Sequence, residues 1–275
     1  MLTVNLTTTH SRLHLCSATV WSLMNQSLKP DFIVLWISRD SYLSDEGIKQ
    51  LPDFVKKFNT INNILVVNYV SNTGPYRKII PALRKGNESD IMVYADDDVI
   101  YGNDWLKILV DCFNRYDRKC VVASRVRIID KNIFGVTKSY SSFDISNSEN
   151  KFNESFIITG VGGAILTKNL IDSQYLNDDS FIVVAPKTDD IWISKIIELS
   201  GTSVISCPQA LSQVHEIQHS NSSLSSQNTL FSKKYGPLKY FVKMQERMFS
   251  YFGLLKTNND TSLKNTNIHF HKKLK

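Results

Sequence analysis

The amino-acid sequence predicts an α/β protein with a Rossmann-like, mostly parallel central sheet, helices on both faces and a helical C-terminal tail. The first observation is a series of short apolar runs, rich in β-branched and aromatic residues, that alternate with stretches of helical period. The second is that one run ends in Asp96, Asp97 and Asp98, where strands of an open α/β sheet place ligand-binding residues. The predicted strands are 2–6, 32–37, 64–69, 91–94 and 121–128.

The first predicted helix covers 13–25, where Leu13, Val20 and Leu23 recur near one face. Pro30 then marks the turn into the second strand. This order of strand, helix and strand is the βαβ unit from which parallel sheets are built. The first half of the chain is therefore predicted to be Rossmann-like.

The second half begins with a segment of different composition. Residues 129–155 are rich in Ser, Asn and Lys with weak periodicity, so we expect a flexible excursion outside the core. A strand at 156–159 then leads into a glycine turn at 160–163. A helix at 188–200 follows, and Gly201 is well placed to end it. Farther on, 238–255 has helical spacing, and from Lys256 the chain is predicted to be a frayed basic tail.

The composition is that of a folded protein of enzyme size. With 275 residues, 42% of them hydrophobic and 21% charged, the chain suits one large α/β domain, or a core domain with a smaller appendage. Its 32 Lys and Arg exceed its 26 Asp and Glu, which gives a net charge of +6 and a pI near 9.0. An anionic partner is expected, and nucleic acid, acidic lipid and the diphosphate of a nucleotide all fit that charge.

Cysteine spacing and hydropathy indicate the compartment. Cys16, Cys112, Cys120 and Cys207 form no CxxC pair, which argues against a zinc site or a disulfide framework and favours a reducing compartment. The first residues do not have the pattern of a signal peptide, and no apolar stretch reaches the roughly 18 residues that a membrane span needs. These observations predict a cytoplasmic location.

The three aspartates carry the clearest chemical signal. Adjacent carboxylates repel one another, and their desolvation is costly, so a cation that neutralises them explains their persistence at the end of a buried strand. A hard divalent cation such as Mn²⁺ or Mg²⁺ on these carboxylate oxygens would also bind diphosphate oxygens and stabilise a phosphate leaving group. The alternative is a solvated acidic turn that precedes the next helix. This chemistry alone leaves sugar transfer and nucleotidyl transfer equally open.

Three segments together give a family resemblance: Asn5–Thr9, Ser22–Asp31 with its Ser-Leu-Met-Asn-Gln start, and the aspartate trio. Over about residues 2–207 the chain resembles bacterial family-2-like glycosyltransferases of the GT-A fold. The resemblance implies that Thr7 and Thr8 approach the base or ribose of a nucleotide sugar. It also implies that Asp96 contacts ribose or metal and that Asp98 binds the metal. The other residues assigned to donor binding are Arg12, Ser38, Asp40 and Asp97.

The same resemblance assigns two further groups to the donor. Arg77 and Lys78 open a predicted helix, and a cation there would stabilise the diphosphate, although a solvated basic helix start is an equal alternative. Gly162 and Gly163 resemble the glycine turn that flanks the transferred sugar, where a side chain would obstruct its approach. The second strand departs from the family pattern, because it ends in Ser-Arg-Asp at 38–40 instead of an acidic-Gly-Ser segment.

Catalysis is assigned to the acidic pair at the start of the helix at 188–200. Thr188 can cap that helix, and a helix N-terminus is expected to keep Asp189 and Asp190 ionised. By resemblance, the second acid of such a pair is the base that deprotonates the acceptor hydroxyl, so Asp190 is the predicted base and Asp189 the alternative. His215 follows the last predicted strand, where related enzymes place a third metal ligand, although a lone histidine is more often structural.

The sequence therefore predicts a metal-dependent, inverting glycosyltransferase of hexosyl or N-acetylhexosaminyl type. The expected donor is a UDP-sugar and the expected acceptor a glycan or lipid-linked glycan of bacterial surface polysaccharide or lipopolysaccharide. By this resemblance 1–128 form the donor half, 156–210 the acceptor and catalytic half, and 211–275 a helical and basic tail.

Two other functions compete with this prediction. A nucleotidyltransferase that makes nucleotide sugars shares the sheet and the metal, but its first loop usually contains glycines, and residues 7–12 contain none. A nucleic-acid or anion-binding module fits the positive charge, but the chain has no basic-aromatic RNA motif or zinc-finger spacing. No nucleic-acid partner is expected.

The segment 231–256 suggests a membrane contact, because lysines and aromatic residues recur there at helical spacing. Such a helix can lie in the anionic inner face of the cytoplasmic membrane. The competing interpretation is a C-terminal helix that packs on the catalytic domain. The residues concerned are Lys233, Lys234, Lys239, Lys243, Tyr240, Phe241, Phe249, Tyr251 and Phe252.

Overall fold

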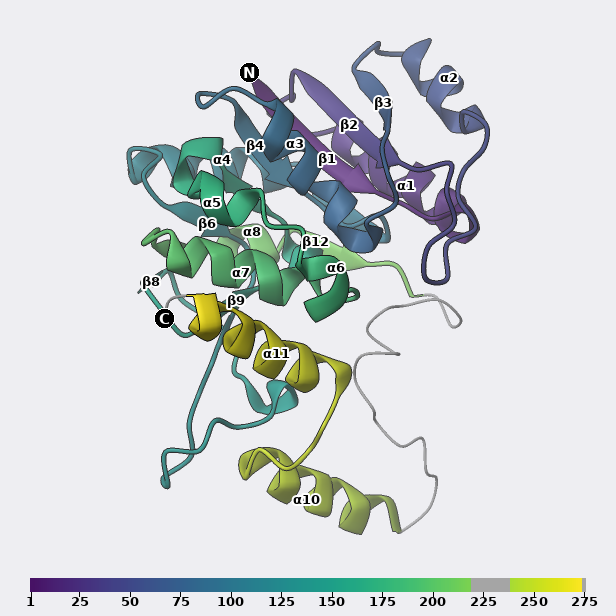
Figure 1. Ribbon diagram of the computed structural model, residues 1–275. Helices are drawn as coiled ribbons and strands as arrows, with labels where there is room; N and C mark the ends of the chain where they lie inside the picture. The colour runs from purple at the N-terminus through teal and green to yellow at the C-terminus, as the bar shows by residue number, and fades with distance from the viewer. Residues whose placement is uncertain (219–237, 274–275) are drawn as a thin grey trace.

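The structure, a computed structural model, describes residues 1–218 and 238–273, and for 238–244 the backbone alone. Within them, a central sheet has the strand order β3-β2-β1-β4-β10-β6-β11-β8, with helices against it (Figure 1). The strands are β1 (Leu2–Thr7), β2 (Phe32–Ile37), β3 (Leu65–Tyr69), β4 (Ile91–Tyr94), β6 (Val121–Ala123), β8 (Lys151–Phe152), β10 (Ala164–Leu166) and β11 (Val204–Ser206). Smaller pairs are β5 (Val99–Tyr101) with β12 (Val214–Glu216) and β7 (Val126–Ile128) with β9 (Phe156–Ile158).

The sheet is mostly parallel. Strands β3, β2, β1 and β4 run parallel to one another, and β6 runs parallel to β11. Strand β10 is antiparallel to β4 and β6, and β8 is antiparallel to β11. The helices are α1 (Leu13–Met24), α2 (Asp53–Asn59), α3 (Ile80–Lys85), α4 (Trp105–Arg115), α5 (Ser173–Leu176), α6 (Phe181–Val184), α7 (Asp189–Leu199), α8 (Pro208–Leu211), α10 (Leu238–Tyr251) and α11 (Asn258–Lys273). This arrangement confirms the predicted fold class, including the C-terminal helical tail.

The local sequence explains why the first unit folds as it does. Val4 and Leu6 on β1 are buried, as parallel strands covered on both faces require. Asn5 lies between them, and its side-chain oxygen accepts a hydrogen bond from Trp36 Nε1 at 2.9 Å, which satisfies a polar group inside the core. On α1 the buried residues Cys16, Val20 and Leu23 recur at the spacing of one helix face.

The predicted strand at 121–128 is wrong as a single element. Val121–Ala123 form β6 in the central sheet, and Val126–Ile128 form β7, which pairs with β9 in a separate two-stranded sheet. The chain leaves the sheet at Ser124 and Arg125 between these strands. A continuous apolar run cannot show this change of sheet, because each half satisfies its own ladder.

Residues 129–155 belong to the fold, contrary to the expectation that they lie outside the core. Tyr140 and Phe143 are buried around a 3₁₀ turn, η3 (Tyr140–Ser142), and pack with Ile157 and Ile191. The hydroxyl of Ser250, at the end of α10, lies 2.8 Å from the hydroxyl of Ser141. The second half of the chain therefore has its own small core beside the main one.

The frayed tail predicted from Lys256 is also wrong. Helix α11 lies along α7 and also contacts α6 (Figure 1). The Phe270 ring is buried, with its centroid 4.8 Å from that of Trp192. The buried stripe of α11 is Asn259, Ser262, Thr266 and Phe270. Three of these four residues are polar, so hydropathy alone gives no signal of an amphipathic helix.

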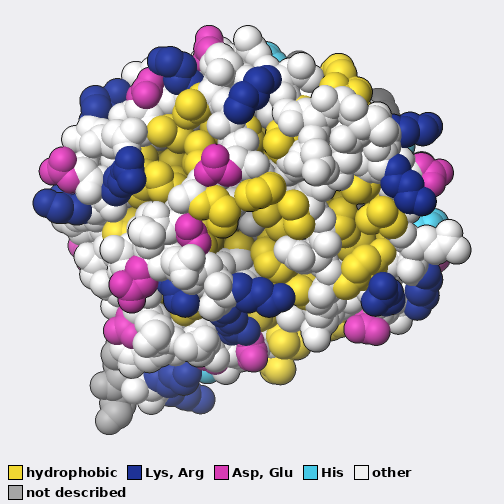
Figure 2. Space-filling model, turned by 90° about the horizontal axis from the view of Figure 1, so that it is seen from above, with side chains coloured by type: hydrophobic (Ala, Val, Ile, Leu, Met, Phe, Trp, Pro, Cys, Tyr) yellow, Lys and Arg dark blue, Asp and Glu magenta, His cyan; other side chains and the backbone are white. Residues whose placement is uncertain are grey.

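Two further expectations concern membranes and cysteines. In the described ranges, 1–218 and 238–273, no helix combines the length and apolarity that a membrane span requires. All four cysteines are buried free thiols. On the face of the molecule in Figure 2, Lys and Arg side chains are interspersed with Asp and Glu, with hydrophobic side chains between them. Positive charge on that face is therefore spread out, which differs from the basic stripe typical of nucleic-acid binding.

Candidate active site

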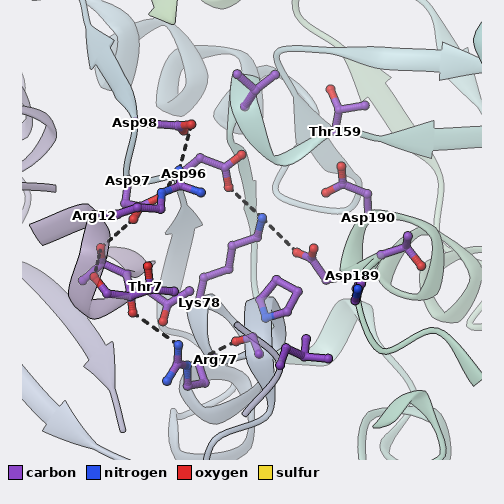
Figure 3. A pocket seen from close by; sticks show the side chains of 18 of the residues that line it. Thr7, Arg12, Arg77, Lys78, Asp96, Asp97, Asp98, Thr159, Asp189 and Asp190 are labelled. Atoms are coloured by element: carbon purple, nitrogen blue, oxygen red, sulfur yellow. Dashed lines mark hydrogen bonds and ion pairs between the residues drawn. The ribbon is translucent and has the colours of Figure 1, made fainter. Parts of the chain in front are cut away.

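A cavity of about 420 Å³ opens where β1 and β4 end. Because parallel strands present their carboxyl ends at one edge, the loop after β1 and the three aspartates after β4 line the same cavity. In Figure 3, Thr7 and Arg12 lie on one side, Thr159 and Asp190 lie on the other, and Lys78 lies between them. We call the side with Thr7 and Arg12 the first wall, and the side with Thr159 and Asp190 the second wall.

Asp97 binds two residues of the loop after β1, Thr8 and Arg12. The Thr8 hydroxyl donates to Asp97 Oδ2 at 2.6 Å, and Arg12 lies 2.5 Å from Asp97 Oδ1 and 2.8 Å from Asp98 Oδ2. Burial raises the pKa of Asp97 to about 6, against the opposing effect of Arg12. Both Asp97 oxygens thus hold the loop after β1 onto the aspartate trio.

Lys78 joins the first wall to the second. Its ammonium lies 2.7 Å from Asp96 Oδ1 and 2.8 Å from Asp189 Oδ2, and the residue is only 5% exposed (Figure 3). Despite the opposing effect of burial, the two carboxylates raise the pKa of Lys78. Residues far apart in the sequence are therefore fixed around one buried charge.

Arg77 has a different surrounding. Its guanidinium is buried, donates to Asp45 Oδ2 at 2.9 Å and to the Thr8 carbonyl at 3.2 Å, and lines the cavity. Burial lowers its pKa, and Asp45 opposes that change. Arg77 therefore supports the loop after β1 through the Thr8 carbonyl, and its charge is paired with Asp45, a residue to which the sequence analysis assigned no role.

The glycine turn comes nearest to the site at Gly160, and not at the predicted Gly162 and Gly163. A Cβ atom on Gly160 would lie 2.3 Å from Lys78 Nζ and 2.8 Å from Asp96 Oδ1. None of Gly160, Gly162 and Gly163 is among the cavity-lining residues, although Thr159 and Val161 are. A Cβ on Gly162 would meet Ser124 and Arg125, and Gly163 has φ +76° and lies against Trp105. Gly160 is thus the glycine that leaves room at the site, while the other two are required by packing.

Asp190 occupies the second wall at the first turn of α7. One of its oxygens accepts a hydrogen bond from the Gly160 backbone N–H at 2.9 Å. Burial, together with the neighbouring charge of Asp189, raises the pKa of Asp190 to about 8. This differs from the expectation that the helix N-terminus keeps the carboxylate ionised, because desolvation outweighs the helix dipole here. A base whose pKa lies near neutrality is well suited to accept a proton.

Besides the two glycines, three further predicted residues lie away from the cavity lining: Ser38, Asp40 and His215. Ser38 is fully buried, and its hydroxyl accepts a hydrogen bond from the Asp40 N–H at 3.1 Å, while Asp40 itself is exposed. His215 is exposed on β12, whereas the next residue, Glu216, lines the cavity. Successive residues of a strand face opposite sides, so the prediction of His215 was one position away from Glu216, the residue that reaches the site.

The cavity also contains residues that the sequence analysis did not assign. A signal was available for Arg125 and Arg127, because they alternate with buried Val126 at the end of an apolar run. No local signal marks Tyr140 or Asn259, which reach the cavity through tertiary packing of η3 and α11. The unassigned lining residues include Asp45, Arg125, Arg127, Tyr140, Glu216 and Asn259.

Two carboxylates of the cavity, those of Asp96 and Asp98, are suitable ligands for a divalent cation. Among residues 1–218 and 238–273, no group of three or more His, Cys, Asp or Glu is arranged to hold a metal ion. Mg²⁺, however, is commonly bound by one or two carboxylates, with substrate phosphates and water completing the shell. Asp96 and Asp98 both line the cavity and supply hard oxygen atoms. The residues present therefore fit a cation that is shared with a bound diphosphate.

Replacing Lys78 should reveal the buried charge network. We expect Lys78→Met to lower the free energy of unfolding by about 3 kcal/mol, because Asp96 and Asp189 lose their common cation. Urea titration measures the change, with an unchanged m-value indicating that the fold persists. Lys107→Met is the matched control, since its pair with Asp111 is exposed and screened by solvent, so its loss should change the stability far less. Equal effects of the two variants would contradict the proposed network.

The chain is similar to one protein family in sequence and to two solved structures in part. A sequence model described as Glycosyl transferase family 2 matches residues 6–172, more than half of the chain. No curated protein matches the sequence. The crystal structure of S. aureus TarS is similar with a TM-score of 0.45 and 18% identity over 74% of this chain, which spans 35% of the TarS chain. The crystal structure of 4-diphosphocytidyl-2C-methyl-D-erythritol synthase has a TM-score of 0.36 and 12% identity over 64% of this chain and 78% of its own.

Proposed function

Because the chain belongs to glycosyl transferase family 2, we propose that this glycosyltransferase moves a hexosyl or N-acetylhexosaminyl group from a UDP-sugar to a hydroxyl of a glycan or lipid-linked glycan. The pathway we propose is bacterial surface polysaccharide or lipopolysaccharide synthesis. The observation that best supports this proposal is that one cavity contains both aspartate groups. Asp96 and Asp98 lie on one side of Lys78, and Asp189 and Asp190 lie on the other. Its first wall would serve the donor and its second wall the acceptor.

On the donor side, Thr7 and Thr8 border the space for the nucleoside, and Arg12 holds the loop that contains them. Asp96 and Asp98 would hold Mn²⁺ or Mg²⁺, which supplies charge neutralisation for the diphosphate when bound. Lys78 pairs with both Asp96 and Asp189, so it would hold Asp96 in place beside the cation. The cation would therefore be the charge that stabilises the leaving nucleoside diphosphate.

On the acceptor side, Asp190 is the proposed base. The acceptor hydroxyl attacks the anomeric carbon as the bond from that carbon to the diphosphate oxygen breaks, and the hydroxyl proton passes to Asp190. Direct displacement of this kind inverts the anomeric centre. Asp189 is the poorer candidate, because one of its oxygens is paired with Lys78 at 2.8 Å. The Gly160 N–H fixes the Asp190 carboxylate by a hydrogen bond of 2.9 Å.

Thermal stabilisation by nucleotide sugars tests this function. A ligand that binds the native state raises the apparent stability, so a panel of UDP-, GDP-, dTDP- and CMP-sugars with MgCl₂ or MnCl₂ identifies the donor. We expect a UDP-sugar to raise the melting temperature, with a larger rise when metal is present. If every nucleotide sugar leaves the melting temperature unchanged with either metal, the proposed donor class is wrong.

We also propose a peripheral contact with the inner face of the cytoplasmic membrane, through an apolar patch formed by Ile133, Phe134, Val136, Phe252 and Leu254. These side chains are exposed, by 82% for Ile133 and 69% for Phe134. The Phe134 and Phe252 rings stack with centroids 6.3 Å apart, so the loop and the end of α10 form one surface. Exposed apolar side chains grouped in this way suit an interfacial contact.

The structure changes the basis of the predicted membrane contact. Lys233 and Lys234 lie outside the described residues, and nothing is described for the side chains of Lys239, Tyr240, Phe241 and Lys243. Phe249 and Phe252 on the C-terminal side of α10 are partly exposed. The competing interpretation was that this segment packs on the catalytic domain, and α10 does contact η3, while α11 contacts α6 and α7, so a truncation before residue 231 would also remove that packing.

Point variants test the membrane contact without truncation. We expect Ile133→Ser with Phe134→Ser to reduce sedimentation with anionic liposomes by about 10-fold or more, since two large side chains lose their apolar burial. Ile61→Ser is the matched control, because Ile61 is 65% exposed and lies just after α2, on the far side of the sheet. Equal sedimentation of the double variant and the full native chain, or no sedimentation of either at low salt, would rule the contact out.

A further inference from the structure

Most of the cations described above in the cavity face carboxylates at short distance. Arg12 lies 2.5 Å from Asp97 Oδ1, Arg77 lies 2.9 Å from Asp45 Oδ2, and Lys78 lies 2.7 Å from Asp96 Oδ1. Each of these charges is thus already compensated within the protein. Their environment is that of structural ion pairs, which hold loops in place.

Arg125 and Arg127 are different. The carboxylate that pairs with Arg125 is that of Glu216, whose Oε1 lies 3.6 Å from Arg125 Nη1, too far for a hydrogen bond, and the Glu216 side chain is 67% exposed. Arg127 donates to the Phe143 carbonyl at 2.9 Å, and the described part of the chain gives it no carboxylate partner. The Nε atoms of both arginines are buried with no hydrogen-bond acceptor among the described residues, as is Arg12 Nε. Neither guanidinium therefore has a carboxylate at hydrogen-bond distance: Arg125 has only the longer pairing with Glu216, and Arg127 has no carboxylate partner among the described residues.

The two side chains are held in place before any ligand arrives. Arg125 and Arg127 flank Val126, so both project from the same face of the chain at β7. The Arg127 guanidinium lies 5.1 Å from the centre of the buried Tyr140 ring, and all three residues line the cavity. Burial and repulsion by Arg127 lower the pKa of Arg125. An anion would relieve both penalties at once.

This pair lies on the second wall. The Arg125 carbonyl accepts a hydrogen bond from the Thr159 N–H at 3.1 Å, and Thr159 lies beside Asp190 in Figure 3. The next residue, Gly160, donates to Asp190. Asp190 also contributes to the electrostatic environment of both Arg125 and Tyr140. The two arginine charges, which lack a close carboxylate, therefore adjoin the proposed base and not the first wall, where Thr7 and Arg12 lie.

We infer that Arg125 and Arg127 bind an anionic group of the acceptor, a phosphate or a carboxylate, close to the hydroxyl that Asp190 deprotonates. This inference rests on the proposed function for its assignment of the second wall to the acceptor. Planar guanidinium groups suit both anions, because each presents paired N–H donors to two oxygens. The substrate class is thus a phosphate- or carboxylate-bearing glycan or lipid-linked glycan, and a wholly neutral sugar would lack the group that this site binds.

The test measures anion binding while the donor side is occupied. Calorimetric titrations of the full chain with glucose 6-phosphate, glucuronate and glucose are made in the presence of saturating UDP and MgCl₂. We expect at least one of the two anionic sugars to bind at least 10-fold more tightly than glucose, and the preference between them identifies phosphate or carboxylate. Arg125→Gln and Arg127→Gln should each weaken that anion by about 10- to 100-fold, the effect of losing a charged hydrogen bond.

Controls separate this inference from the proposed function. Arg118→Gln removes an exposed arginine whose described partner is the neutral Asn114, and it should leave the anion titration unchanged. Arg127→Lys keeps the charge without the guanidinium fork, so it should fold as the native chain does and lose only part of the affinity. The melting temperature with UDP and MgCl₂ reports the donor side of each variant independently.

The possible results are distinct. The inference is wrong if glucose binds as well as both anions, if neither anion binds, if UDP displaces the anion, or if both glutamine variants bind it as the native chain does. Failure of UDP to bind would instead contradict the proposed donor. In that case, loss of anion affinity in the two glutamine variants would still support the arginine site.

Discussion

Asp190→Asn is expected to lower turnover by about 10²- to 10⁴-fold while leaving donor affinity close to that of the native protein. The amide keeps the size of the side chain, and its oxygen can still accept from the Gly160 N–H, but it cannot take a proton from the acceptor. Steady-state kinetics with the donor found by thermal stabilisation measure the loss, and calorimetry measures donor affinity. Asp189→Asn should reduce turnover less, because Asp189 pairs with Lys78.

The pH dependence gives an independent check on the base. The folded-state pKa of Asp190 is raised to about 8 by burial and by Asp189, so the carboxylate is mostly protonated below that pH. Since the ionised form is the active base, kcat/KM should rise with pH up to about 8 and then level off. This rise should be absent in Asp190→Asn. A larger loss in Asp189→Asn would exchange the two roles, and near-native turnover in both variants would place the base elsewhere.

Asp98→Ala and Asp96→Ala are expected to abolish transfer and the metal-dependent part of donor binding. Each removes one of the two carboxylates that would hold the cation against the diphosphate. The fold should persist in Asp98→Ala, because Arg12 keeps its contact with Asp97 at 2.5 Å. Donor titrations with and without MgCl₂ measure the loss. Asp111→Ala, which removes an exposed aspartate on α4, is the matched control. An active Asp98→Ala enzyme that needs no cation would remove the basis of the metal assignment.

The sequence was sufficient where a local pattern and a rule of the fold act together. An apolar strand followed by aspartates, and an acidic pair at the start of a helix, each have a fixed place at the edge of a mostly parallel sheet. The structure accordingly brings Thr8, Arg12, Asp96, Asp98 and Asp190 to one cavity. Their roles in binding and catalysis stay predictions, but their convergence was foreseeable.

The sequence was insufficient where partners meet across long stretches of chain. Arg77 resembles a free cation until Asp45 is found beside it, 32 residues earlier. A shift of one residue on β12 decides whether His215 or Glu216 reaches the cavity, and strand register follows from pairing with β5. The sequence did not predict helix α11, because Ser262 and Thr266, on its buried face, are polar.

The most direct test of the central claim is to identify the product that the native protein releases from its nucleotide substrate. Incubation with UDP-sugars, or with UTP and a sugar 1-phosphate, in the presence of MgCl₂ or MnCl₂ is followed by ³¹P NMR. A glycosyltransferase with the cavity described here should release UDP from a UDP-sugar only when the metal is present, and Asp98→Ala should release none. Release of pyrophosphate from UTP and a sugar 1-phosphate, with no UDP from any UDP-sugar, would contradict the account and indicate a nucleotidyltransferase.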